Sequence, residues 1–198
     1  MSSEEKIIAL AAKKAFITTK DIQALGFARH QLYQLESKGL LVKVAPGCFT
    51  LPASAISEHY ELILLAQNYP KMVVSLLSAL SFHGITTQNP FQTWISLPKG
   101  AWKPSFPNSA VRVSFISEPA YSFGIERHTI DGVEVSIYSV AKTIADCFKF
   151  RNQIGLDITL EALKEAHRTQ KCTAQELFVA GKMTRTHNVM RPYLEAIL

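Results

Sequence analysis

Four side chains that hydrogen-bond well to nucleic acids lie close together in the chain: Arg29, His30, Tyr33 and Gln34. Arginine can pair bidentately with guanine and glutamine with adenine, while histidine and tyrosine can donate to a phosphate or pack against a sugar. On one face of a helix, this set would both read bases and position the backbone. The competing interpretation is a solvated polar face, which any small helical domain needs.

Positive charge gathers in the same part of the chain. The protein has 198 residues and a formal net charge of +5, and residues 1–52 hold seven Lys and Arg against four Asp and Glu. Four of these lysines are candidate phosphate contacts: Lys14, Lys20, Lys38 and Lys43. The net charge is too moderate to prove a nucleic-acid partner, but its uneven distribution favours one at this end of the chain.

Three short helices are predicted to position these residues. Apolar periodicity places them at residues 3–14, 20–25 and 28–37. The expected N-caps are Ser3 for the first helix and Thr18 or Thr19 for the second. Gly26 and Gly39 allow the left-handed backbone that ends the second and third helices. In the third helix, the candidate reading residues then lie largely opposite an apolar face formed by Ala28, Leu32 and Leu35.

A hairpin is predicted directly after the third helix. Its sequence is LLVKVAPGCFTL, two β-prone runs joined at Pro46 and Gly47. Helix, helix, turn, helix, hairpin is the order of a winged helix-turn-helix, in which the third helix enters the major groove of double-stranded DNA. We therefore expect a winged helix-turn-helix over residues 1–52.

A second, mixed α/β domain is expected over residues 58–198, after a linker of small residues and a proline at 52–57. The predicted strands are 93–97, 111–116, 124–129 and 133–138, the last two joined by an Asp-Gly turn. The predicted helices are 58–67, 75–83, 139–150, 159–168, 173–181 and 188–198. The expected fold class of the whole chain is α+β.

The helix at 139–150 is predicted to be amphipathic. Val140, Ile144 and Cys147 or Phe148 face inward in this prediction, and the three basic residues Lys142, Lys149 and Arg151 face outward. The basic face is either plain solvated surface or a contact for phosphate or an acidic partner. The same two interpretations apply to the C-terminal residues Lys182, Arg185, His187 and Arg191.

The sequence gives little support for metal binding or catalysis. Cys48, Cys147 and Cys172 form no CxxC pair, and the histidines are too scattered for a recognisable ligand set. Asp146 and Asp157 lack the Gly-Ser turn of a nucleotidyltransferase, and neither GxxxxGK[ST] nor GxSxG occurs. Asp146 is expected at a helix surface or in a local hydrogen bond. We expect no catalytic residue, no metal, no cofactor and no enzyme activity.

The chain is expected to be cytoplasmic. No stretch approaches the ~20 apolar residues that span a bilayer. The N-terminal sequence MSSEEKIIALAAKK lacks the basic start of a secretory signal. No membrane partner is therefore expected.

A family resemblance strengthens the prediction for the N-terminal domain. The stretch TTKDIQALGFARHQLYQLESKGLLVKVAPGCFTLP resembles the N-terminal domain of the AbiEi-type antitoxins. The segments SLLSALSFHGIT, TWISLPKG and VEVSIYSVAKTIADCFKFRNQIGLDITLEALKEA are similar to the second domain of that family. The resemblance implies a repressor that binds repeats in its own promoter. It also implies the antitoxin of a type IV toxin-antitoxin system, functionally paired with a nucleotidyltransferase-like toxin.

One position departs from the family pattern. The family commonly carries an arginine just before the glycine of the wing turn, whereas this chain has Pro46 followed by Gly47. Lys43 is therefore the better candidate for a wing contact. Two alternative functions stay open: a winged-helix adaptor that contacts protein, and a stand-alone transcription regulator without a toxin.

Overall fold

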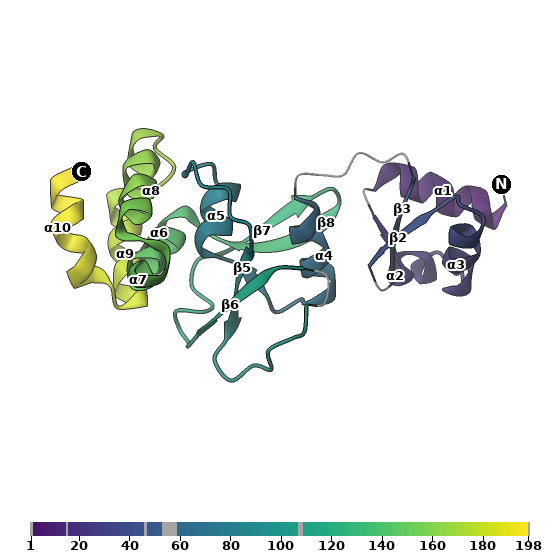
Figure 1. Ribbon diagram of the computed structural model, residues 1–198, viewed down its shortest axis with the longest axis horizontal. Helices are drawn as coiled ribbons and strands as arrows, with labels where there is room; N and C mark the ends of the chain where they lie inside the picture. Colours follow the sequence, from purple (N-terminus) through teal and green to yellow (C-terminus); the bar gives the residue numbers. More distant parts are fainter. Residues whose placement is uncertain (1, 15, 46, 53–58, 107–108, 198) are drawn as a thin grey trace. The chain divides into compact units, whose positions relative to one another are not determined.

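The computed structural model of the protein describes residues 2–14, 16–45, 47–52, 59–106 and 109–197 (Figure 1). Two compact units are present: Met1–Asn68 with Thr129–Glu134, and Tyr69–His128 with Val135–Leu198. The expected α+β class is confirmed, since helices and sheets are both present. Residues 53–57 of the predicted linker lie outside the described residues, and the predicted domain boundary stays a prediction.

The first unit contains the three predicted helices and the predicted hairpin. Its elements are α1 (Ser3–Lys13), β1 (Ile17–Thr18), α2 (Thr19–Ala24), α3 (His30–Ser37), β2 (Val42–Ala45), β3 (Cys48–Thr50) and α4 (Tyr60–Asn68). The N-cap of α1 is Ser2 and not Ser3, because the Ser2 hydroxyl accepts from the Glu5 amide while the Glu5 carboxylate accepts from the Ser2 amide. Thr18 caps α2, as one of the two predicted candidates.

The first unit also contains a small three-stranded sheet in the order β1-β3-β2. Ile17 and Lys43 both lie opposite Phe49, one in each neighbouring strand. The sequence predicted only the hairpin, and Ile17 lies between the first two predicted helices, where no strand was predicted. A buried apolar cluster joins the sheet to α1, α2 and α3: Ile7, Ala11, Ile17, Ile22, Leu32, Leu35, Leu41 and Phe49. This shared apolar cluster thus fixes the orientation of α3 against the sheet.

Asp21 links the start of α2 to the end of α1, and its replacement should weaken the unit. Its carboxylate accepts from the Thr18 amide at 2.8 Å and from Lys14 Nζ at 2.6 Å. Burial alone would raise the pKa of Asp21, but the hydrogen bonds from Lys14 and Thr18 outweigh it and hold the pKa below 3.8. Because both side chains of the ion pair keep some solvent contact, we expect Asp21→Asn to cost only about 1 kcal/mol at neutral pH.

The pH dependence of this effect has a definite sign. A carboxylate whose pKa is lowered in the folded state supplies stability above its ordinary pKa and loses it as the pH falls through the lowered value. The difference in unfolding free energy between parent and Asp21→Asn should therefore shrink below about pH 4. Urea unfolding at several pH values measures it. A difference that grows on acidification would contradict this role of Asp21.

The second sheet has five strands in the order β6-β5-β4-β8-β7. The strands are β4 (Val73–Val74), β5 (Thr93–Pro98), β6 (Val111–Ile116), β7 (Ile125–Ile130) and β8 (Val133–Tyr138). The pairs β5–β6 and β4–β8 are parallel, whereas β4–β5 is antiparallel. The predicted turn between β7 and β8 is confirmed: Asp131 and Gly132 both have positive φ, at 49° and 80°. Strand β4 was not predicted.

Helix α6 is the centre of the helical part of the second unit. The helices are α5 (Leu76–Phe82), α6 (Val140–Lys149), α7 (Arg151–Ile154), α8 (Leu156–Arg168), α9 (Ala174–Thr184) and α10 (His187–Ile197). Helix α6 contacts the other five, and residues 140–148 are all buried. No helix of the described chain is both long and apolar enough for a transmembrane span.

One prediction for α6 is wrong. Lys142 was expected to face outward, yet its side chain is fully buried and forms an ion pair with Asp146, one turn further along. Asp146 is 1% exposed, so it lies in the core and not at a helix surface, although the expected local hydrogen bond is present. The reason is that Gly124 and the Tyr138 ring pack on Lys142, while α5, α8 and α9 pack around the rest of α6. Lys149 is exposed, as expected.

Candidate nucleic-acid interface

Helix α3 divides cleanly into a buried and an exposed face. Leu32 and Leu35 are at most 1% exposed and belong to the core. The four predicted reading residues are all exposed: Arg29, His30, Tyr33 and Gln34. Ala28, expected on the inner face, is exposed as well, because the helix begins only at His30. The four predicted reading residues are therefore accessible to solvent.

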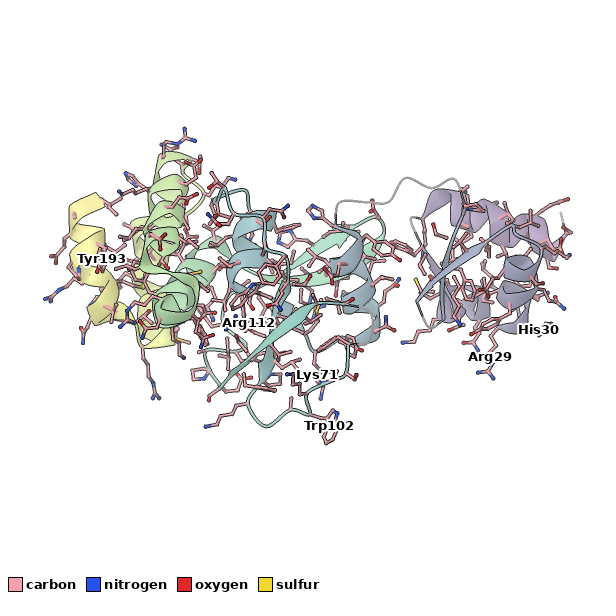
Figure 2. All side chains as sticks on the ribbon, viewed as in Figure 1. Arg29, His30, Lys71, Trp102, Arg112 and Tyr193 are labelled. Atoms are coloured by element: carbon pink, nitrogen blue, oxygen red, sulfur yellow. The ribbon has the colours of Figure 1, made fainter. Side chains whose placement is uncertain are left out.

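Arg29 and His30 lie at the N-terminal end of α3. Arg29 occupies the N-cap position in a helical conformation, with φ −54° and ψ −30°, and its side chain caps no backbone amide. Figure 2 shows both side chains projecting away from the helices that carry them. In helix-turn-helix proteins the N-terminal residues of the recognition helix are the ones that reach base edges. Arg29 and His30 have the position and the freedom that this contact requires.

Tyr33 joins α3 to the wing. Its ring packs edge-on against Phe49 of β3, with centroids 5.2 Å apart and planes at 88°. Lys43 of β2 places its Nζ 5.4 Å from the centre of the same ring. Tyr33 keeps 41% of its surface exposed, so the residue still contacts solvent beside these two neighbours. The structure thus brings Lys43, predicted as a separate wing contact, onto the surface of α3.

The other predicted phosphate contacts are arranged differently. Lys38, at the end of α3, forms an ion pair with Glu4 of α1 and is about half exposed. Lys14 is held by Asp21 and therefore has a structural role. Lys20 is exposed near the start of α2. The pairing of Lys38 with Glu4 was missed, because the two residues lie 34 positions apart and no local pattern connects them.

The turn of the wing is tied to the start of α2. Pro46, the departure from the family pattern, lies outside the described residues. Gly47 has φ +71°, a left-handed value that favours glycine, and its carbonyl accepts from the Thr19 amide at 3.1 Å. The next residue, Cys48, is buried, and burial raises the pKa of its thiol to about 12. Cys48 is therefore a protonated core residue at neutral pH.

Among the described residues, no group of three His, Cys, Asp or Glu side chains could hold a metal ion. The features that stand out in the first unit are instead an exposed polar face of α3 and the neighbouring Lys43 of β2. Three helices, a three-stranded sheet and this arrangement define a winged helix-turn-helix, a fold in which the third helix is the usual DNA-reading element.

Comparison with known families agrees with that class. Residues 5–52 match the family model described as a transcriptional regulator, AbiEi antitoxin. The predicted resemblance of the N-terminal part is confirmed over these residues, and the likeness predicted for the second domain stays a prediction. A comparison with curated proteins found no match.

A solved crystal structure has a fold similar to that of most of this chain. The protein is similar to the crystal structure of the RV2827C protein from Mycobacterium tuberculosis, with a TM-score of 0.62 and 16% sequence identity. The similarity covers 91% of this chain and 71% of that chain. At this level of identity, the likeness shows a shared fold and nothing about a shared function.

Proposed function

We propose that the protein binds specific double-stranded DNA sequences in its own promoter, represses its operon, and is the antitoxin of a type IV toxin-antitoxin system. The observation that carries the DNA-binding part is the exposed face of α3, with Lys43 of the wing beside it. The family match over residues 5–52 supports the regulator and antitoxin parts.

In the proposed complex, α3 lies in the major groove. Arg29 pairs with a guanine and Gln34 with an adenine, because their side chains match the donor and acceptor patterns of those base edges. His30 and the Tyr33 hydroxyl contact phosphate or sugar and set the register of the helix. Lys43 contacts the phosphate backbone beside the groove, while its position over Tyr33 keeps the wing and the helix on one surface.

Lys43→Ala should weaken binding to all duplexes alike. A phosphate contact carries no sequence information, so operator and scrambled duplex should lose affinity by a similar factor. The plot of log affinity against log salt should also become shallower by about 0.9, the value for one phosphate contact. Fluorescence anisotropy at several salt concentrations measures both quantities.

Lys38→Ala is the matched control for this experiment. Lys38 already pairs with Glu4, and a phosphate contact by Lys38 would have to break that ion pair. Replacement of Lys38 should therefore lower the affinity for DNA less than replacement of Lys43 does. A Lys43→Ala variant that lost affinity for the operator alone would contradict the assignment of Lys43 to the backbone.

The antitoxin role is tested by co-expression with a nucleotidyltransferase-like toxin encoded beside the gene. The parent protein is expected to restore growth of cells that express the toxin. Arg29→Ala should still restore growth while failing to repress a reporter driven by the upstream region, because Arg29 serves DNA binding alone. Growth no better than with an empty vector would refute the antitoxin role and leave DNA binding to be judged by the reporter.

A further inference from the structure

A second exposed cluster of basic and aromatic character lies at one end of the five-stranded sheet. We call Lys71, Lys99, Trp102 and Lys103 the Trp102 surface. Val73 of β4 pairs with Ser96 of β5, which brings Lys71, just before β4, to the end where β5 stops and Lys99 follows. Figure 2 shows Lys71 and Trp102 at this same end. All four side chains are exposed.

Trp102 is exposed although its loop is anchored on both sides. The indole is 89% exposed, whereas Trp94, in the neighbouring strand, is only 5% exposed. Before Trp102, the Lys99 amide donates to the Ile116 carbonyl at 2.8 Å. After it, the Tyr69 hydroxyl donates to the Ser105 carbonyl at 2.7 Å. The backbone around Trp102 is therefore held in place while its large apolar ring stays in water.

The sequence that contains this ring carries charge of a single sign. The sequence from residue 62 to 117 contains four Lys and Arg and no Asp or Glu. Within the described chain, no ion pair joins Lys71, Lys99 or Lys103 to a carboxylate. The nearest acid along the chain, Glu118, accepts hydrogen bonds from Ser122 in its own turn. The Trp102 surface thus presents a flat aromatic ring and three lysines without an ion pair in the described chain at one end of the sheet, against the single nearby carboxylate of Glu118.

We propose that the Trp102 surface binds single-stranded nucleic acid, with one base stacked on the indole and phosphates held by the three lysines. Exposed aromatic rings beside lysines form the stacking platforms of proteins that bind single strands. A duplex fits less well, because the faces of its bases are already covered by their neighbours. A protein partner also fits less well, because interface cores favour tryptophan but are depleted of lysine.

The test is a titration of the full chain with a labelled single strand of about 12 nucleotides, a length within the usual site sizes. Trp102→Ala should weaken binding roughly tenfold or more, and Trp102→Phe less, since phenylalanine keeps a smaller stacking ring. Phe91→Ala is the matched control, because Phe91 is also 89% exposed but precedes β5 at its other end. Phe91→Ala should bind as the parent does.

Further measurements separate this site from others. Lys99→Ala/Lys103→Ala should make the salt dependence shallower by about 1.4, the value for two phosphates on a single strand. Arg29→Ala/Lys43→Ala should keep its affinity for the single strand, because neither residue belongs to the Trp102 surface. Titration of the same sequence as DNA and as RNA shows which of the two binds more tightly.

Three results would overturn the proposal. The first is a Trp102→Ala variant that binds the single strand as tightly as the parent. The second is loss of single-strand binding in Arg29→Ala/Lys43→Ala, which would assign that binding to α3. The third is quenching of the indole fluorescence by polyglutamate as strong as by the oligonucleotide at equal charge, which would point to an acidic protein. Thermal unfolding of Trp102→Ala should match the parent, since the ring is exposed.

Discussion

Replacement of Asp146 by alanine is expected to lower the free energy of unfolding by about 3–5 kcal/mol, the range found when one partner of a buried ion pair is removed. The ammonium group of Lys142 would then stay in the core without its counter-charge. Both side chains of this pair are at most 1% exposed. Reorientation toward water is blocked, because α6 is packed against α5, α8 and α9.

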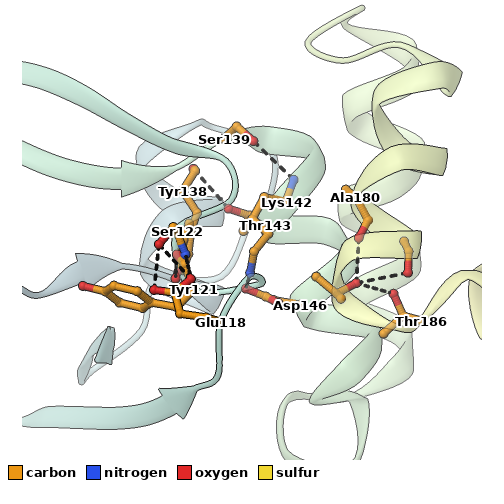
Figure 3. Close-up of polar contacts among 12 residues, drawn as sticks. Glu118, Tyr121, Ser122, Tyr138, Ser139, Lys142, Thr143, Asp146, Ala180 and Thr186 are labelled. Carbon is orange, nitrogen blue, oxygen red and sulfur yellow. Dashed lines mark hydrogen bonds and ion pairs between the residues drawn. The ribbon is translucent and has the colours of Figure 1, made fainter. Parts of the chain in front are cut away.

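The surroundings of the pair leave little room for another arrangement. Figure 3 shows the Lys142 side chain reaching the Asp146 carboxylate. The Lys142 ammonium also lies 4.1 Å from the centre of the Tyr138 ring, which stabilises the positive charge. Gly124 packs directly on Lys142, since a Cβ atom there would lie 2.7 Å from the lysine Cβ.

The pair is nevertheless costly to bury. Burial raises the pKa of Asp146 and lowers the pKa of Lys142, and the attraction between the two charges opposes both shifts. A second buried oxygen, Asp146 Oδ1, has no hydrogen-bond partner among the described residues. Lys142→Met/Asp146→Leu should therefore be close to neutral or stabilising, as is common when apolar residues replace both members of such a pair.

Urea unfolding of the parent, the single variant and the double variant tests this account. We expect the single variant to be far less stable than the double variant. A loss below about 1 kcal/mol for Asp146→Ala would be typical of a surface ion pair and would contradict the burial of Lys142.

The second large effect is expected in DNA binding. Arg29→Ala should weaken binding to the upstream region of the gene by about 1–3 kcal/mol and relax the preference for one base pair. Arg29 is exposed at the start of α3 and caps no backbone amide, so its removal should leave the unfolding midpoint unchanged. Binding to a set of duplexes that differ at single positions measures the change in preference.

Arg29→Lys separates charge from geometry. A lysine keeps the positive charge but lacks the planar fork that pairs bidentately with guanine. The variant should therefore keep much of the salt-dependent affinity and still lose the base preference. Unchanged binding of Arg29→Ala to the upstream region would show that the groove contact is assigned to the wrong residue.

The first unit was largely predictable because its signals are local. Capping residues and apolar spacing set the helices, and the two β-prone runs set the wing, so the exposed face of α3 followed from its own periodicity. The caps fell within one residue of their true places. Strand β1 was missed, because a two-residue strand has no alternation of its own and forms only by pairing with the distant Phe49.

The second unit shows where periodicity fails. Lys142 and Asp146 have the spacing of an exposed ion pair, and that spacing is the same on a surface and in a core. Only packing between distant parts of the chain decides that both are buried, with Gly124 on Lys142 and with α5, α8 and α9 around α6. The contact of Lys43 with Tyr33 is equally non-local, because the helix and the wing meet there through the core residue Phe49.

The central claim is that the winged helix-turn-helix reads a specific sequence in double-stranded DNA. The most direct test is a titration of the purified chain against its own upstream region and a scrambled duplex of equal length, at two salt concentrations. We expect the upstream duplex to bind at least about 10³-fold more tightly than the scrambled one, with both affinities falling as salt rises. Equal affinity for the two duplexes, or no salt-dependent binding to either, would contradict the claim.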